Sequence, residues 1–248
     1  MQTSELDTPP LPSIGTLKEG ELHAQLKAWY LRAGDRVEER VSGYVVDIVR
    51  DELLIEIQTG SFAPLKRKLD ALTKEHPVRI VTPVAQVRRI VRLSDAGEIL
   101  STRRSPIRGR VENVFARLVS IPELLCRPQL EIEVLLTEEN ELRVHHPGKA
   151  FRRHGWVVCG RSLSAVADRA LITGPKDAVA LLPLQLPEPF GTAELADAAG
   201  ISRRLAQQMT YCLRNMGALE VVGKNRRELV YRRRNEPSRD ATAARKAP

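Results

Sequence analysis

The feature that most constrains the fold is the short gap between two β-patterned runs. Val37–Arg50 and Leu53–Gln58 are rich in Val, Ile and Leu, and only Asp51-Glu52 separates them. The second run alternates apolar and polar side chains in part, as a strand with two different faces does. A two-residue connection predicts a β-hairpin in which Arg50 lies opposite Leu53.

Helical patterns flank this hairpin on both sides. Residues Glu19–Leu31 carry apolar side chains at helical spacing and are followed by Gly34, a helix stop signal. Ser61 is a candidate N-cap for a second helix, which His76-Pro77 ends, and Val78–Val81 has the composition of a further strand. The predicted order over residues 19–83 is therefore α-β-β-β-α-β.

The predicted hairpin brings two carboxylates together. If Arg50 opposes Leu53, then Asp47 opposes Glu56 on the same face, with Cβ atoms roughly 5 Å apart. Gln58 projects from that face as well. Like charges in this position repel, and Mg²⁺ or Mn²⁺ between them would remove the conflict because both ions prefer carboxylate oxygens. The alternatives are one carboxylate at a wet sheet edge, or a proton shared by the two.

These residues carry a resemblance to a known group of enzymes. Asp47 followed by Glu56-Ile57-Gln58, within this order of elements, resembles the PD-(D/E)xK nuclease superfamily. Glu21-Leu22-His23 and the string LLIEIQT also look like a family of uncharacterised prokaryotic proteins with this core and a C-terminal winged helix. The fold that the resemblance implies is α/β (α+β), with a restriction-endonuclease-like αβββαβ core.

The resemblance also implies site residues for hydrolysis of phosphodiester bonds. They would be Glu21, Asp47, Glu56 and Gln58, with one or two Mg²⁺ or Mn²⁺ ions held by Asp47, Glu56 and the Ile57 carbonyl. Gln58 departs from the pattern, because the superfamily usually has Lys there. Lys66 or Lys68 could reach into the site from the following helix, but surface solvation is the simpler role for both, and His23 is assigned to a surface or capping role.

Positive charge is concentrated in two stretches of a chain whose formal net charge is +8. Residues 82–118 contain eight Arg against three acids, and residues 224–248 contain nine Lys or Arg against three acids. Clustered basic residues are typical of proteins that bind polyphosphates. Within a middle α/β extension, residues 84–185, the basic loop from Thr102 is expected to contact nucleic-acid phosphates through Arg103, Arg104, Arg108 and Arg110. The alternative is a solvated loop.

Residues 190–231 follow the pattern of a winged helix-turn-helix. Two helices, Thr192–Ala199 and a longer one capped by Ser202, precede a β-hairpin. The second helix has an apolar stripe and an exposed polar side on which we place Thr210. Arg and Gln on such a helix are standard major-groove contacts, and basic residues at the wing tip hold phosphate. The predicted DNA-binding residues are Arg203, Arg204, Gln207, Gln208, Lys224, Arg226 and Arg227.

Several classes of protein are excluded or left open. The sequence has no apolar run of membrane-spanning length, begins without a signal-like segment, and its three Cys form no zinc or disulfide pattern, which favours the cytoplasm. Residues 1–18 and 232–248 are expected to be disordered. The favoured function is a metal-dependent endonuclease delivered to DNA by the winged helix. The alternatives are a non-catalytic DNA-binding regulator and an interaction module with a protein partner on the winged helix; a homodimer stays open.

Overall fold

A computed structural model describes residues 20–225 and 228–234. The predicted leader, the wing residues Arg226 and Arg227, and the tail from residue 235 lie outside this description. The described chain is mixed α/β, with one large sheet and several helices, as the sequence predicted. No helix in these two stretches is long and apolar enough to cross a bilayer.

The N-terminal elements follow the predicted order α-β-β-β-α-β. The first β-patterned run is divided into two strands by Ser42 and Gly43, both with positive φ angles, of 49° and 83°. A glycine takes this backbone conformation without steric cost. The elements are α1 (Gly20–Tyr30), β1 (Arg36–Val41), β2 (Tyr44–Arg50), β3 (Leu53–Ile57), α2 (Lys66–Leu72) and β4 (Val78–Leu93).

Three long strands dominate the middle of the chain. Strand β4 has 16 residues and runs through the predicted boundary between residues 83 and 84. Strands β6 and β7 have 16 and 17 residues. The remaining elements are β5 (Ile99–Arg104), α3 (Phe115–Leu118), β6 (Leu130–His145), β7 (Trp156–Ile172), α4 (Pro175–Ala180), α5 (Thr192–Ala199), α6 (Arg203–Asn215), β8 (Leu219–Asn225) and β9 (Glu228–Arg233).

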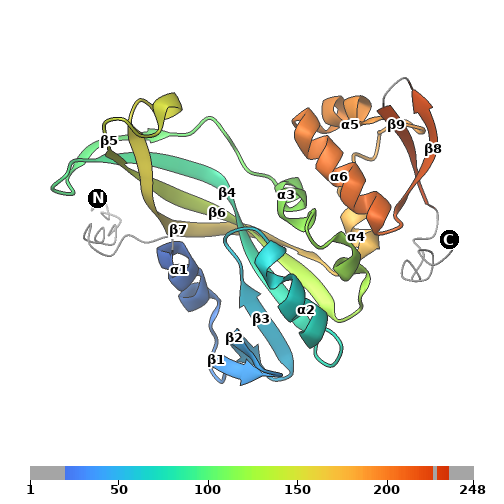
Figure 1. The fold of residues 1–248 in the computed structure, drawn as a ribbon, viewed down its shortest axis with the longest axis horizontal. Helices are drawn as coiled ribbons and strands as arrows, with labels where there is room; N and C mark the ends of the chain where they lie inside the picture. The colour runs from blue at the N-terminus through green and yellow to red at the C-terminus, as the bar shows by residue number, and fades with distance from the viewer. Residues whose placement is uncertain (1–19, 226–227, 235–248) are drawn as a thin grey trace, which may run out of the picture.

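The large sheet has the strand order β1-β2-β3-β4-β6-β7, with β5 also paired to β4 (Figure 1). Strand β4 is parallel to β3 on one side and to β6 on the other, whereas the remaining pairs in this sheet are antiparallel. The pairing of β4 with β6 shifts register between Ala85 and Val87. Such bulges redirect side chains and are frequent near functional sites.

The two faces of the sheet are covered differently. Helix α1 places Leu22 and Leu26 on Ile55 and Ile57 of β3, in a small core of its own. The opposite face carries a larger core that includes α2, α3 and α6. Strand β3 is therefore enclosed between α1 and α2, and side chains from both helices can reach its C-terminal end.

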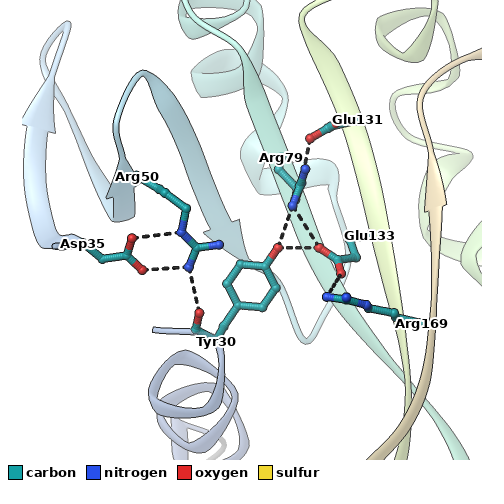
Figure 2. A network of polar contacts seen from close by, with 7 residues as sticks. All are labelled: Tyr30, Asp35, Arg50, Arg79, Glu131, Glu133 and Arg169. Carbon is teal, nitrogen blue, oxygen red and sulfur yellow. Dashed lines mark hydrogen bonds and ion pairs between the residues drawn. The ribbon is translucent and has the colours of Figure 1, made fainter. Parts of the chain in front are cut away.

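A polar network fixes the C-terminal end of α1 to the sheet (Figure 2). Arg50 donates to both carboxylate oxygens of Asp35, at 2.9 and 2.7 Å, and to the carbonyl of Tyr30. The Tyr30 hydroxyl contacts Glu133 and accepts from Arg79 at 3.0 Å. Bidentate Arg–carboxylate pairs restrict geometry as well as contributing energy, so α1 and the residues it carries are held in a defined position.

Residues 190–234, called the C-terminal unit below, form two helices followed by a hairpin. The Ser202 hydroxyl accepts a hydrogen bond from the Leu205 N–H at 3.2 Å, which confirms the predicted cap. The apolar stripe of α6 is buried as predicted. The prediction that Thr210 lies on the exposed side is wrong, because its exposed fraction is 1%. Figure 1 shows α6 beside α3, and one continuous core extends from the sheet to Tyr231.

Candidate functional site

The predicted hairpin register is confirmed, and it ends one pair before the two carboxylates. Arg50 lies opposite Leu53 and Ile48 opposite Ile55. Beyond that pair β2 and β3 separate, and the carboxylate of Asp47 accepts a hydrogen bond from the Ile57 N–H at 2.9 Å. The Ile57 N–H, which points toward β2, thus bonds a side chain in place of a strand carbonyl. The Ile57 carbonyl faces the same side, since both groups of one residue point the same way in a strand.

Helix α1 supplies two basic side chains to Asp47. Nε2 of His23 lies 3.4 Å from Oδ2 of Asp47, and Nζ of Lys27 lies 4.0 Å from Oδ1. Burial acts to raise the pKa of Asp47, but the hydrogen bonds from His23 and Ile57 outweigh it and the pKa is lowered. The hydrogen bond to Asp47 raises the pKa of His23. His23 is half-buried, and the surface or capping role predicted for it did not include this contact with Asp47.

Helix α2 supplies the cation that meets Glu56. The Lys68 ammonium contacts the Glu56 carboxylate and donates to the carbonyl of Val45. Glu56 is 5% exposed, and this burial raises its pKa, with a further increase from the negative charge of Asp47. The side chain of Lys68 is 14% exposed, so its predicted role in surface solvation is wrong.

Gln58 is turned away from the carboxylates. Its side-chain Nε2 donates to the carbonyl of Ser61 at 2.7 Å, which ties it to the loop before α2. Its backbone carbonyl accepts from the hydroxyl of Thr82 at 2.7 Å and from Arg117 at 3.4 Å. The predicted role of Gln58 in orienting a water requires a different side-chain rotamer.

Glu21 lies in the first turn of α1, on the side that faces β7. Its carboxylate accepts from Gln25 at 3.1 Å, and Gln25 in turn accepts from the Leu163 N–H of β7. Burial raises the pKa of Glu21. The α1 side chains that contact Asp47 are His23 and Lys27. The role of Glu21 as an additional acid of this site therefore stays a prediction.

The two carboxylates are chemically unequal. Asp47 is held ionised by hydrogen bonds, and Glu56 is pushed toward the protonated state by burial. Pairs with opposite pKa shifts are common where acid and base chemistry is done. The donor set of Asp47, Glu56 and the Ile57 carbonyl is all oxygen and fits Mg²⁺ or Mn²⁺. Across residues 20–225 and 228–234, no three His, Cys, Asp or Glu side chains group as metal ligands, so the Ile57 carbonyl is needed to complete three protein ligands.

The predicted basic loop is partly a strand. Arg103 and Arg104 belong to β5 and are exposed opposite Ile90 and Arg89 of β4. Arg108 is exposed on the segment that follows. Arg110 is less available for phosphate, because it donates to the Ala199 carbonyl at 2.7 Å and pairs with Glu112 at 2.8 Å.

Two of the predicted DNA-contacting residues of the C-terminal unit line a pocket. Arg203 and Gln207 line a pocket of about 690 Å³ between α6 and the hairpin, together with Glu228. Arg203 is held there by an ion pair of 2.9 Å with Glu228. Arg204 and Lys224 are exposed and Gln208 is half-buried, while Arg226 and Arg227 lie outside the described residues.

Glu228 joins the hairpin to the start of α5, and its replacement by Gln is expected to destabilise the protein. Its carboxylate accepts from the N–H groups of Thr192 and Ala193, at 2.6 and 3.1 Å. The hydrogen bond from the Thr192 hydroxyl, with these N–H groups and Arg203, lowers the pKa of Glu228. Loss of a charged cap at a helix start costs about 0.5–2 kcal/mol at neutral pH, which urea unfolding would measure.

The pH dependence of that difference identifies its cause. A carboxylate whose pKa is lowered by folding stabilises the protein above the ordinary glutamate pKa. This contribution disappears as the pH falls through the lowered pKa, so Glu228→Gln and the wild type should converge in acid. Glu220→Gln on β8 is the matched control and should change stability by less than about 0.5 kcal/mol. A difference for Glu228→Gln that persists unchanged in acid would exclude the charge as its origin.

The fold and the site together define a class of protein. It is a mixed α/β protein with one large sheet, a half-buried and a buried carboxylate each contacted by basic side chains from a different helix, and a C-terminal pair of helices followed by a hairpin. The chain belongs to the family described as Domain of unknown function (DUF8091), whose model matches residues 20–173. That range extends from α1 to the end of β7 and contains Asp47, Glu56 and Lys68.

A relative extends the similarity beyond this range. The chain is 26% identical over 230 residues to an "Uncharacterized protein" of Treponema pallidum (strain Nichols), covering 92% of this chain and 90% of that protein. The alignment therefore reaches into the C-terminal unit. No solved structure matches the chain.

Proposed function

We propose that this protein is a metal-dependent endonuclease that hydrolyses phosphodiester bonds of DNA. The observation that carries the proposal is that Asp47 and Glu56 lie near enough to influence each other's charge where β2 and β3 separate, with Lys68 in contact with Glu56. Two carboxylates at the ends of neighbouring strands, one of them buried and in contact with an ammonium from α2, can hold a divalent ion and a phosphate for phosphodiester hydrolysis. The resemblance to the PD-(D/E)xK superfamily supports the same function.

Asp47 and Glu56, with the Ile57 carbonyl, would hold Mg²⁺ or Mn²⁺. Such an ion lowers the pKa of a bound water and offsets negative charge on the phosphate. Lys68 takes the place of the Lys that the superfamily usually has at position 58, because its ammonium arrives at Glu56 from α2. It would hydrogen-bond a water or a phosphate oxygen. His23 positions the Asp47 carboxylate, which it contacts at 3.4 Å.

Nicking of supercoiled plasmid tests this function. The full-length protein should convert supercoiled DNA to the open circle with Mn²⁺ or Mg²⁺, and EDTA should stop the reaction. A preparation that retains DNA but leaves plasmid intact with either ion, at every pH between 6 and 9, would exclude endonuclease activity on duplex DNA.

A non-catalytic DNA-binding regulator is the second candidate. The observation that favours it is the contact of Lys68 with Glu56, because the ammonium already relieves the repulsion between the two carboxylates without a metal ion. This function predicts that DNA binding survives Asp47→Asn unchanged and that the wild type cleaves no substrate. The two candidate functions thus predict different results in the same nicking experiment.

In both candidates we propose that the C-terminal unit is a winged helix that binds DNA. Deleting it would expose the core that α6 shares with the sheet, so substitutions of exposed residues are the better test. Replacing Arg204 and Lys224 by Gln should weaken binding. It should also reduce the slope of log K against log salt by about two, since each lost phosphate contact removes roughly 0.9.

The control for this experiment removes the same charge elsewhere. Arg40→Gln and Lys74→Gln, both at exposed positions of the sheet region, should leave the slope unchanged. Binding to duplex DNA would be measured by fluorescence anisotropy at several salt concentrations. If the Arg204 and Lys224 variant keeps the wild-type affinity and slope, binding belongs to the exposed arginines Arg103, Arg104 and Arg108 instead.

A further inference from the structure

A pocket of about 160 Å³ lies beside the C-terminal end of β3, where β4 is irregular. Leu22 of α1 and Thr59 form part of its wall. The charged side chains that line it are four arginines and one carboxylate, namely Arg88, Arg108, Arg117, Arg161 and Glu139. The lining therefore carries a formal charge of +3, which marks it as a site for an anion.

Arg117 is a half-buried arginine of this pocket whose hydrogen bonds go to neutral groups. Its guanidinium contacts the Thr82 hydroxyl and donates to the Gln58 carbonyl at 3.4 Å. Within the described part of the chain it has no carboxylate within ion-pair distance. Burial is the main reason that its pKa falls to about 10; the negative charge of Glu139 opposes the decrease, and the nearby Arg161 and Arg88 add to it. Burial of a cation that only Glu139 offsets, among two further arginines, is costly, and a bound anion would reduce that cost.

Few carboxylates are available to pair with the other arginines of the pocket. Glu141, close by on β6, pairs with Arg143 at 2.5 Å, with Arg88 at 3.5 Å and with Arg161 at 4.0 Å. One carboxylate thus serves three cations. Glu139 accepts from the Thr137 hydroxyl at 2.7 Å and offsets one charge of the pocket, so an excess of positive charge remains.

The segment that carries Arg108 is fixed over the pocket. The Ser105 N–H donates to the Arg88 carbonyl and the Gly109 N–H to the Ala85 carbonyl, both at 2.8 Å. A Cβ atom at Gly109 would lie 2.6 Å from the Ala85 carbonyl oxygen, so only glycine allows this close approach. A wall that is already ordered loses little conformational entropy when a ligand binds.

We propose that this pocket binds a phosphate group. Arginine forks match the geometry of phosphate oxygens, and a phosphate monoester carries about −1.5 to −2 charges at neutral pH, against one for a carboxylate. The pocket has room for about five water molecules at roughly 30 Å³ each, which suits the phosphate group alone. An adjoining pocket of about 430 Å³ shares Leu22, Thr59 and Arg161 and would hold the rest of the ligand.

The phosphate can belong to the end of a nucleic-acid strand or to a small molecule. Leu22 precedes His23 on α1, and Thr59 follows Glu56 by three residues, so a bound phosphate lies next to the candidate hydrolytic site. A strand anchored here by its terminal phosphate would pass that site. Phosphate binding itself requires no cleavage, so it is tested without a divalent ion and stands or falls independently of the endonuclease proposal.

Thermal unfolding in inorganic phosphate is the first test. Phosphate should raise the Tm of the full-length protein more than chloride does at equal ionic strength, because it binds the folded state. Arg108→Gln and Arg161→Gln change side chains that reach the surface and so preserve folding. Each should raise the phosphate concentration needed for half of the shift by about tenfold, the effect of losing one charge-assisted hydrogen bond.

Arg40→Gln on β1 removes the same charge away from the pocket and should behave as the wild type. In EDTA, a single-stranded oligonucleotide with a 5′-phosphate should bind more tightly than its 5′-hydroxyl counterpart, and Arg161→Gln should abolish the preference. Equal binding of the two strands, with the phosphate-dependent Tm shift intact, would assign the site to a small-molecule phosphate. A Tm shift no larger than in chloride, or variants that respond as the wild type does, would overturn the proposal.

Discussion

Replacing Asp47 by Asn is expected to abolish metal-dependent cleavage while the protein stays folded and keeps its affinity for DNA. The amide oxygen of Asn can still accept the hydrogen bond of the Ile57 N–H, which Asp47 accepts at 2.9 Å. It cannot supply the charge that holds a divalent ion. Loss of the ion removes both the activated water and the stabilisation of phosphate charge. At roughly 4 kcal/mol this corresponds to about a thousandfold loss of rate.

Glu56→Gln should have a similar effect, because Glu56 is the second carboxylate of the proposed site. Asp95→Asn, an exposed change in the turn between β4 and β5, is the matched control and should retain wild-type activity. Single-turnover cleavage rates at saturating Mg²⁺ or Mn²⁺ would be compared, with circular dichroism to verify folding. Asp47→Asn activity within tenfold of the wild type would remove Asp47 from metal binding.

Gln58 should matter far less than either carboxylate. Its amide bonds the Ser61 carbonyl, so Gln58→Ala removes a loop contact worth about 1 kcal/mol and should reduce cleavage by tenfold at most. Lys68→Met should cost more, since it removes the cation at Glu56. Gln58→Lys restores the residue that is commoner in the superfamily. If Gln58→Ala were as inactive as Asp47→Asn, Gln58 would have a role that its observed rotamer does not explain.

The sequence predicted the part of the site that depends on local geometry. A two-residue connection fixes the register of a hairpin, and the positive φ of Asp51, 51°, is the backbone conformation that such tight turns use. From that register alone, Asp47 and Glu56 were expected to be neighbours. The end of the β2–β3 pairing at Ile48 and Ile55 was not predictable, because separation of two strands depends on what packs against them.

The cations of the site come from elements that only tertiary packing brings near. Lys68 lies 12 residues after Glu56, on the following helix. Its charge alone does not distinguish it from Lys66 or Arg67, which carry the same charge. Leu69 and Leu72 are buried on α2. Lys68 lies between Leu65 and Leu69, beside the stripe that packs on the sheet, and this position was the available signal.

The middle of the chain was harder to interpret because its strands are long and interrupted. The β6–β7 pairing shifts register at three places, and each shift reverses the alternation of side chains between faces. Strand β6 also carries many acids, which pair with arginines of neighbouring strands, as Glu133 does with Arg79. Its sequence therefore lacks the simple alternation by which a strand is recognised.

Phe115→Ala is expected to destabilise the whole protein by about 3–5 kcal/mol, the usual cost of removing a buried Phe side chain. Phe115 is 0% exposed. It lies on α3, and its carbonyl accepts a long contact of 3.9 Å from the Cys212 thiol of α6. The side chain thus belongs to the core that joins the sheet to the C-terminal unit, and a cavity there weakens the contacts of both.

Because one core serves both parts, they should unfold together, in the variant as in the wild type. Trp29 and Trp156, on α1 and β7, report on the sheet through fluorescence, while far-ultraviolet circular dichroism is sensitive to α5 and α6. The two signals should give a single coincident urea transition, shifted to lower urea in Phe115→Ala. Phe151→Ala, at a position that is 96% exposed, is the matched control and should change stability by less than about 0.5 kcal/mol. Two separate transitions, with the tryptophan transition unchanged by Phe115→Ala, would instead indicate that the C-terminal unit is an independent domain. Deletion of that unit would then be a valid test of its part in DNA binding.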